Sequence, residues 1–201
     1  EGDVLFDDFS RGRYATDASM YQIMPLGVVT PKTTNDVEGV FSVAAENATP
    51  MLPRGAGTSQ CGQTVNEALI IDTSKYLDQV VSLEPSQLRV IVEPGLVLDQ
   101  LNQILKPYGL WFPVDISTSS QATIGGMVGN NSCGARSIRY GTMRDNVVSI
   151  KALLTNGEHV TFGSLASHVR GATLSRVNQN LTKKLFEIGR READEIDARF
   201  P

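Results

Sequence analysis

The spacing of apolar residues in the first third of the chain alternates between the periods of strands and helices. Residues 23–30 and 68–72 are short apolar runs typical of buried strands, and residues 51–53 form another short strand. After the first run, apolar side chains at helical spacing over residues 34–44 predict an amphipathic helix with an N-cap at Thr34. We therefore expect strands and helices to alternate here.

Two pairs of β-rich segments predict antiparallel hairpins. Residues 79–84 and 88–93 are separated by a short polar turn that begins with proline. Residues 147–154 and 159–162 flank Asn156-Gly157, a strong sequence signal for a tight hairpin turn. Each pair is therefore expected to form a two-stranded hairpin.

Two helices and one long segment without periodicity complete the pattern. Apolar residues at helical spacing predict an amphipathic helix over residues 97–105 and a charged helix over residues 178–200. Residues 111–140, in contrast, are mostly Gly, Ser, Thr and Asn around a few apolar positions. Such long loops are uncommon in compact domains and are often functional. The predicted fold class is α+β, with two lobes that meet at glycine-rich loops.

Charge and composition exclude several classes of function. The 201 residues carry 18 Lys and Arg against 22 Asp and Glu, with no basic run, which argues against nucleic acid as the main partner. The longest apolar runs are far shorter than the roughly 18 to 20 residues of a membrane span. Cys61 and Cys133 do not have the spacing of a metal site, so we predict no metal. A cytoplasmic location is the simplest interpretation, with peripheral association with the inner membrane as an alternative.

Residues 54–62 form a glycine-dense loop directly after a predicted strand. Small residues let a backbone approach a ligand closely, and consecutive amides can form a concave nest for an anion such as a pyrophosphate. The loop is not a dinucleotide fingerprint of the Rossmann type. Gly62 follows Gly57 by five positions where that fingerprint requires three, and no amphipathic helix follows.

A second segment, residues 117–134, combines paired glycines with hydroxyl and amide side chains. Together with the first loop it completes a set of six ordered motifs. They are Pro53-Arg54-Gly55-Ala56-Gly57-Thr58-Ser59, Glu93-Pro94-Gly95, Pro113-Val114-Asp115, Thr123-Ile124-Gly125-Gly126, Asn130-Asn131-Ser132-Cys133-Gly134 and Arg139-Tyr140-Gly141. In this order they resemble FAD-linked oxidases of the vanillyl-alcohol oxidase and p-cresol methylhydroxylase type, over roughly residues 21–163. Within that superfamily the chain is most similar to D-lactate dehydrogenases, the glycolate oxidase flavin subunit and D-2-hydroxyglutarate dehydrogenases. The long bacterial members that continue into a substrate domain and an iron–sulfur domain resemble it in particular.

The resemblance implies a two-lobed FAD-binding domain of the p-cresol methylhydroxylase type, with FAD held between the lobes. Lobe one would span about 21–75 and lobe two about 76–163. Residues 1–20 would be an N-terminal extension. Residues 164–201 would form a linker and helix leading to a substrate domain that this chain does not contain.

The resemblance also implies a set of cofactor-binding residues. Backbone amides of residues 55–59 would hold the pyrophosphate, residues 113–115 would border the flavin cleft, and the later motifs would line the flavin and its ribityl chain. The predicted set is Pro53, Arg54, Gly55, Ala56, Gly57, Thr58, Ser59, Gly62, Pro113, Asp115, Gly125, Gly126, Asn130, Ser132, Gly134, Tyr140 and Ile150. Many superfamily members attach the flavin through a histidine where this chain has Thr58, so we expect non-covalent FAD. Ala56 replaces a common glycine, which is a mild change if its φ is negative.

The implied function is oxidation of a D-2-hydroxyacid, of the D-lactate, glycolate or D-2-hydroxyglutarate type, by hydride transfer to FAD. The electron acceptor is not identified, and the full-length parent is expected to carry an iron–sulfur cluster in its C-terminal part. We assign no catalytic residue, because the motifs supply no convincing base, and we expect this chain alone to be inactive. Two alternatives stay open: a module that binds FAD or another nucleotide without redox turnover, and an FAD-dependent reductase of the cell-wall precursor type.

Overall fold

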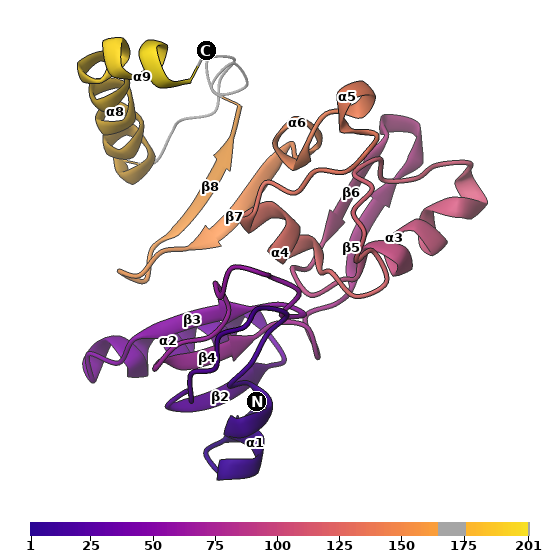
Figure 1. Ribbon diagram of the computed structural model, residues 1–201. Coiled ribbons are helices and arrows are strands. Elements are labelled where there is room, and N and C mark those ends of the chain that lie inside the picture. Colours follow the sequence, from indigo (N-terminus) through magenta and orange to yellow (C-terminus); the bar gives the residue numbers. More distant parts are fainter. Residues whose placement is uncertain (165–175, 201) are drawn as a thin grey trace. The chain divides into compact units, whose positions relative to one another are not determined.

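The computed structural model describes residues 1–164 and 176–200. It divides into two compact units, Glu1–Val147 and Val148–Pro201 (Figure 1). Strands and helices both contribute to each unit, in agreement with the predicted α+β class.

The first unit contains a four-stranded sheet in the order β1-β2-β4-β3. Its strands are β1 (Gly2–Leu5), β2 (Gly27–Pro31), β3 (Met51–Arg54) and β4 (Leu69–Asp72). β4 pairs in parallel with both β2 and β3, whereas β1 is antiparallel to β2. All residues of β2 and most of β4 are buried, as expected for parallel strands covered on both faces.

Helix α2 (Thr34–Glu46) connects β2 to β3, as its apolar spacing predicts. Its N-cap is Thr33, one residue before the predicted cap at Thr34. The Thr33 side chain accepts a hydrogen bond from the Asp36 amide, and the Asp36 carboxylate accepts one from the Thr33 amide. This reciprocal capping box satisfies two amides at the start of the helix, which is why the helix begins here.

Residues 1–20, predicted as an extension, contain β1 and the short helix α1 (Asp8–Arg13). β1 forms an edge of the first sheet, where Asp3 accepts a hydrogen bond from the Thr30 hydroxyl and pairs with the Lys75 ammonium group. The start of the chain is thus tied to the sheet by polar contacts as well as by strand pairing.

A second group of elements in this unit surrounds its own apolar cluster. The predicted hairpin consists of β5 (Val80–Glu84) and β6 (Arg89–Val92), joined by the 3-10 turn η1 (Pro85–Gln87). The predicted amphipathic helix is α3 (Leu98–Leu105), followed by η2 (Lys106–Tyr108). The buried cluster consists of Leu96, Leu98, Leu101, Leu105, Val114, Ala122, Ile124, Met127 and Met143.

Three short helices lie in or just after the segment 111–140, which sequence pattern alone predicts as a long loop. They are α4 (Ile124–Gly129), α5 (Ser137–Tyr140) and α6 (Met143–Asn146). Glycine disfavours helix, but Ile124 and Met127 place their side chains in the apolar cluster. Burial of these side chains offsets the low helix propensity of the sequence.

The second unit contains the predicted hairpin of β7 (Ser149–Leu153) and β8 (His159–Gly163). The charged segment 178–200 is not one helix but two, α8 (Arg176–Arg191) and α9 (Ala193–Arg199), with a break at Glu192. The Asn178 side-chain amide donates a hydrogen bond to the Thr161 carbonyl, 2.8 Å, which joins α8 to β8. Part of the predicted linker, residues 165–175, lies outside the described residues.

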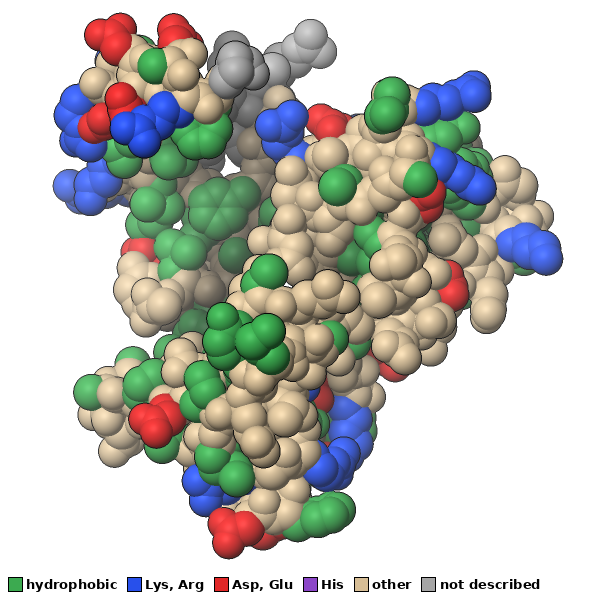
Figure 2. Space-filling model, in the orientation of Figure 1, with side chains coloured by type: hydrophobic (Ala, Val, Ile, Leu, Met, Phe, Trp, Pro, Cys, Tyr) green, Lys and Arg blue, Asp and Glu red, His purple; other side chains and the backbone are tan. Residues whose placement is uncertain are grey.

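Lys and Arg side chains are interspersed with Asp and Glu side chains over the face of the molecule that Figure 2 shows. Among the described residues, no helix is long and apolar enough to cross a membrane. The same described ranges contain no group of three or more His, Cys, Asp or Glu side chains arranged to hold a metal ion.

Candidate functional site

The glycine-dense loop begins at the carboxyl ends of two neighbouring parallel strands. Arg54 is the last residue of β3 and lies opposite Asp72, the last residue of β4, in the strand register. Residues 55–62 follow directly. Ligands of sheets with parallel strands characteristically bind beyond this carboxyl edge, so the topology places the loop where a cofactor is expected.

The backbone of this loop has a shape that only glycine adopts easily. Gly57 has a φ of +69° and Gly62 a φ of +73°, both in the left-handed region. A Cβ atom on Gly55 would collide with the hydroxyl of Thr123. Ala56 does not have a positive φ, so alanine replaces the more common glycine there without backbone strain. The loop fits the close backbone approach that a pyrophosphate requires.

Thr123 joins the two glycine-rich segments. It is the N-cap of α4, 2% exposed, and its hydroxyl oxygen accepts a hydrogen bond from the Gly126 amide at 3.4 Å. The backbone of Gly55 packs against this same hydroxyl. Thr123 is in the sequence motif but not in the predicted set of binding residues; a threonine before Ile-Gly-Gly was the available signal for an N-cap.

The motif Glu93-Pro94-Gly95 packs against the start of α4. The Gly125 amide donates to the Pro94 carbonyl at 2.7 Å, and a Cβ on Gly125 would lie 2.7 Å from the Pro94 Cβ. On its other side, the Gly95 amide donates to the Leu77 carbonyl at 2.7 Å. Gly125 thus has no free N–H for a ligand, and the motif connects the first sheet's carboxyl edge with α4.

Asp115 and the end of the Asn-Asn-Ser-Cys-Gly motif are held together. A Cβ on Gly134 would collide with the Asp115 carbonyl oxygen. The Asp115 carboxylate accepts a hydrogen bond from the Arg136 amide at 3.0 Å, and its other oxygen lies 3.7 Å from Arg136 Nε. The close backbone contact explains why residue 134 is glycine.

The asparagine pair closes α4 and fixes the next turn. Asn130 is the C-cap of α4 and is exposed, while Asn131 has a φ of +47°. The side-chain oxygen of Asn131 accepts hydrogen bonds from the Thr142 hydroxyl at 3.0 Å and the Arg144 amide at 2.9 Å. Ser132 donates its amide to the Met127 carbonyl at 2.9 Å. Asn131 therefore has a structural role, and the Asn130 side chain is accessible to a ligand.

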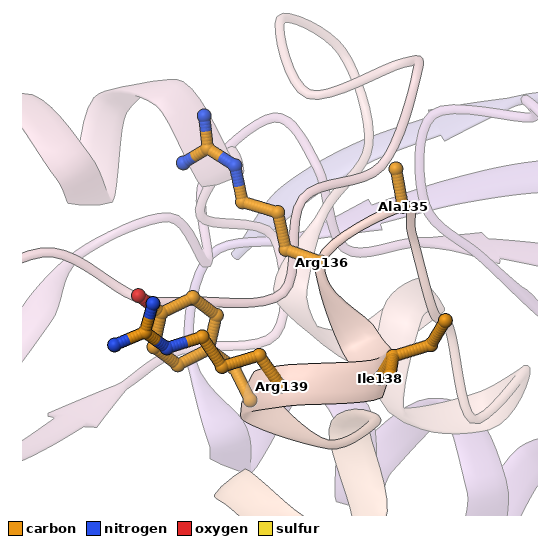
Figure 3. Close-up of a pocket in the computed structure, with 5 residues that line it drawn as sticks. Ala135, Arg136, Ile138 and Arg139 are labelled. Atoms are coloured by element: carbon orange, nitrogen blue, oxygen red, sulfur yellow. The ribbon is translucent and has the colours of Figure 1, made fainter.

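A pocket of 330 Å³ is lined by Ala135, Arg136, Ile138, Arg139 and Tyr140 (Figure 3). In Figure 3 the Arg136 and Arg139 side chains extend to one side of the segment and Ile138 to the other. Arg139 lies over the Tyr140 ring, 5.3 Å from its centroid, and the Trp111 ring meets Tyr140 edge-on at 5.3 Å. Such exposed arginine–aromatic contacts are weakly stabilising.

The side chain of Arg54 points into the protein. Its guanidinium donates hydrogen bonds to the backbone carbonyls of Tyr14 (3.1 Å), Thr16 (2.8 Å) and Thr64 (3.0 Å). Burial lowers the pKa of this guanidinium, while the nearby Asp72 carboxylate opposes the shift. A contact between Arg54 and a cofactor would therefore use its backbone.

The remaining predicted residues are distributed over both units. Pro53 is exposed on β3, whereas Thr58 and Ser59 are partly buried in the loop. The Ser59 hydroxyl pairs with the Gln63 side chain. Pro113 is also partly buried. Ile150 lies on β7 in the second unit, so the structure does not bring it together with the others in one compact unit.

Several known proteins are similar to this chain. A family described as FAD binding domain matches residues 25–163. The D-2-hydroxyglutarate dehydrogenase of Escherichia coli (strain K12) is 38% identical over 160 residues, which are 78% of this chain and 16% of that protein. The glycolate oxidase subunit GlcD of Bacillus subtilis (strain 168) is 34% identical over 181 residues, 88% of this chain and 38% of that subunit. The mitochondrial D-lactate dehydrogenase [cytochrome] of Arabidopsis thaliana is 39% identical over 145 residues, 71% of this chain and 25% of that protein.

A solved structure of alkyldihydroxyacetonephosphate synthase superposes with a TM-score of 0.71 over 81% of this chain and 32% of that protein, at 20% identity. This likeness confirms the predicted α+β fold of the p-cresol methylhydroxylase type. The chain spans from about a sixth to two fifths of the length of the three curated relatives. The match covers most of the chain and includes both glycine-rich segments, so the chain belongs to the FAD binding domain family.

Proposed function

We propose that this chain is the FAD-binding part of an enzyme that oxidises a D-2-hydroxyacid, and that the loop 55–62 holds the FAD pyrophosphate. The observation that carries the proposal is the contact between Gly55 and the Thr123 hydroxyl at the carboxyl edge of the first sheet. It brings together two glycine-rich segments that are more than sixty residues apart in the sequence.

The other predicted residues receive roles that follow from their accessible groups. Amides of residues 55–59 offer donors to the phosphates, and the partly exposed Asp115 and the exposed Asn130 border the flavin side. Gly125, Gly126, Ser132 and Gly134 are proposed as contacts because of their place in the family motif, and through groups other than their amides, which all donate within the protein. Tyr140 and Ile150 are further contacts that the same motif predicts. Thr58 provides no group that bonds covalently to a flavin, so FAD is held by non-covalent contacts. When bound, FAD supplies the hydride acceptor for the oxidation.

The relatives support this substrate class, because their names specify D-2-hydroxyglutarate, glycolate and D-lactate. These proteins are much longer than their matched segments. We propose that the groups that bind the hydroxyacid and accept its hydroxyl proton belong to the part of their length that this chain does not span. The proposal assigns no catalytic base to this chain.

The cofactor half of the proposal is tested by titrating the purified chain with FAD and with riboflavin, which lacks the pyrophosphate, and following flavin fluorescence. FAD should bind much more tightly than riboflavin. Acid precipitation of the complex should then leave the flavin in the supernatant. Equal affinity for the two flavins contradicts the pyrophosphate site, and yellow flavin in the pellet contradicts non-covalent binding.

The catalytic half is tested by dye reduction with D-lactate, glycolate, D-malate and D-2-hydroxyglutarate. The 201-residue chain should show no turnover, because positioning of the substrate supplies about 7 to 11 kcal/mol of such barriers and depends on the absent groups. The full-length parent should reduce the dye with one of these acids. FAD binding without turnover in the parent would favour a pure binding module, and flavin bleaching by NADPH would favour a reductase.

Two further features are proposed for the parent. An iron–sulfur cluster in its remaining part would accept electrons from the flavin, and peripheral attachment to the inner membrane would bring it to an acceptor. Electron paramagnetic resonance of the dithionite-reduced parent tests the first. Fractionation of cells into cytosol and membrane tests the second.

A further inference from the structure

We infer that residues 14–21, here called the N-terminal clasp, hold the pyrophosphate loop in its binding shape, with Arg54 as the positioning residue between them. The clasp lies before the residues 25–163 that match the FAD binding domain family. This inference rests on the proposed function, because it concerns the same loop.

Arg54 ties the clasp to both ends of the loop. It stands at the start of the loop, and its guanidinium donates to the carbonyls of Tyr14 and Thr16 in the clasp and to that of Thr64 just beyond the loop. The planar guanidinium presents several donors in a rigid fork, which one lysine ammonium group cannot reproduce over the same span. Three backbone carbonyls from two segments, the clasp and the chain just after the loop, therefore meet at one side chain.

Three more contacts tie the clasp to the loop independently of Arg54. The Ala18 amide donates to the Gly57 carbonyl at 3.0 Å, in the middle of the loop. The Thr64 hydroxyl donates to the Asp17 carboxylate at 2.8 Å. A Cβ on Gly62 would lie 2.5 Å from the Tyr21 ring, so that ring packs directly on the loop. The loop is held at its start, middle and end.

The clasp itself is anchored in the sheet. The Tyr14 ring lies against the Arg54 guanidinium, 5.2 Å from its Cζ, and the Tyr14 hydroxyl donates to the buried Asp72 carboxylate at 2.7 Å. Asp72 also accepts hydrogen bonds from the amide and hydroxyl of Ser74. Tyr14 thus connects the Arg54 guanidinium to Asp72 at the end of β4.

This arrangement has two consequences for an anionic ligand. A loop with glycines at positive φ has many conformations when free, so holding it in one shape removes an entropy cost from binding. The guanidinium also lies close behind the loop, since a Cβ on Gly57 would be 2.5 Å from Arg54 Nη2. Its positive charge raises the electrostatic potential at the amides that face the phosphates.

The test compares matched pairs of variants in the 201-residue chain. Arg54→Lys and Asp17→Ala each remove clasp contacts, while Arg89→Lys on β6 and Asp8→Ala on α1 make the same changes at exposed positions. Two quantities are measured: the dissociation constant for FAD, and hydrogen exchange of the amides of residues 55–64 in the protein without FAD. Exchange in α3 serves as the internal reference for global stability.

Arg54→Lys should weaken FAD binding by about tenfold or more, because at least one charged hydrogen bond is lost, and Asp17→Ala by a smaller factor. Both should speed exchange in residues 55–64 and leave α3 unchanged, whereas the controls behave as wild type. If Arg54→Lys unfolds, Asp17→Ala decides, because Asp17 is only partly buried. Wild-type exchange in the loop of Asp17→Ala overturns the clasp. Failure of the wild-type chain to bind FAD overturns the proposed function, and the exchange data still report on the clasp.

Discussion

Gly57→Val tests the candidate site most directly, because Gly57 combines backbone strain with a close neighbour. At a φ of +69°, an ordinary L-residue costs about 1 to 2 kcal/mol, and a β-branched residue costs more. The new Cβ would stand 2.5 Å from Arg54 Nη2, so the guanidinium would have to leave the Thr16 carbonyl. Loss of a hydrogen bond from a charged donor costs about 1.5 to 3 kcal/mol. Together these costs disfavour the native loop shape by about 2.5 to 5 kcal/mol.

The protein should avoid most of this cost by changing the shape of the partly exposed loop, and it should therefore stay folded. The cost then appears in binding, where about 3 kcal/mol corresponds to roughly a hundredfold weaker dissociation constant for FAD. Fluorescence titration with FAD measures the loss, and thermal unfolding verifies the fold. Gly39→Val is the matched control, because Gly39 lies exposed in α2 and only its chain neighbours and the helix's own backbone can lie within 4 Å of its Cβ position. A folded Gly57→Val protein with wild-type affinity would refute the placement of the site.

Three other predictions concern stability and ionisation. Thr123→Val should lower the free energy of unfolding by about 1 kcal/mol, because valine cannot cap α4, and an unchanged urea midpoint would contradict this. The pKa of Asp3 is lowered to about 2, first by its hydrogen bond from Lys75, so its stabilising contribution is present above the unfolded-state pKa of about 4 and is lost as the pH falls towards 2. In Asp3→Asn, the free energy of unfolding should depend less on pH between about 4 and 2 than in the wild type. An equal pH dependence in the two proteins would count against the contact between Asp3 and Lys75. Burial and the hydrogen bond to Asp72 raise the pKa of Tyr14 to about 12, so its contribution is complete below about pH 10 and is lost as the pH rises through 12. The ultraviolet titration of wild type minus that of Tyr14→Phe should show one tyrosine ionising near pH 12; ionisation near 10 would disprove the burial.

The sequence predicted those turns and helices whose conformation depends on residues close together in the chain. Asn156-Gly157 indicated the turn between β7 and β8, where Gly157 has a φ of +82°. The apolar stripe over residues 97–105 indicated α3, which buries three of its leucines. Both signals depend on local geometry: a turn needs a residue that tolerates positive φ, and a helix repeats its buried face every three to four residues.

Helix boundaries and weak helices required the structure. Thr33 and Thr34 are both good caps, and only the reciprocal hydrogen bonds with Asp36 select Thr33. The glycine-rich start of α4 has low helix propensity, so its helical form depends on burial of Ile124 and Met127 in the cluster with α3. The sequence pattern cannot show this burial, because the side chains that pack against Ile124 and Met127 come from distant segments of the chain.

The candidate site likewise has features that the sequence indicated and features that only the structure shows. The glycines of residues 55–62 and the order of the motifs indicated a phosphate loop and FAD from the sequence by itself. Only the tertiary structure decided that Thr123 lies against Gly55, and that Arg54 turns away from the loop surface to bind the carbonyl of Tyr14, 40 residues earlier. Composition and spacing report the conformations that each segment prefers. Contacts between segments so far apart depend on how the whole chain packs, because a partly buried guanidinium must find its hydrogen-bond acceptors where the fold places them.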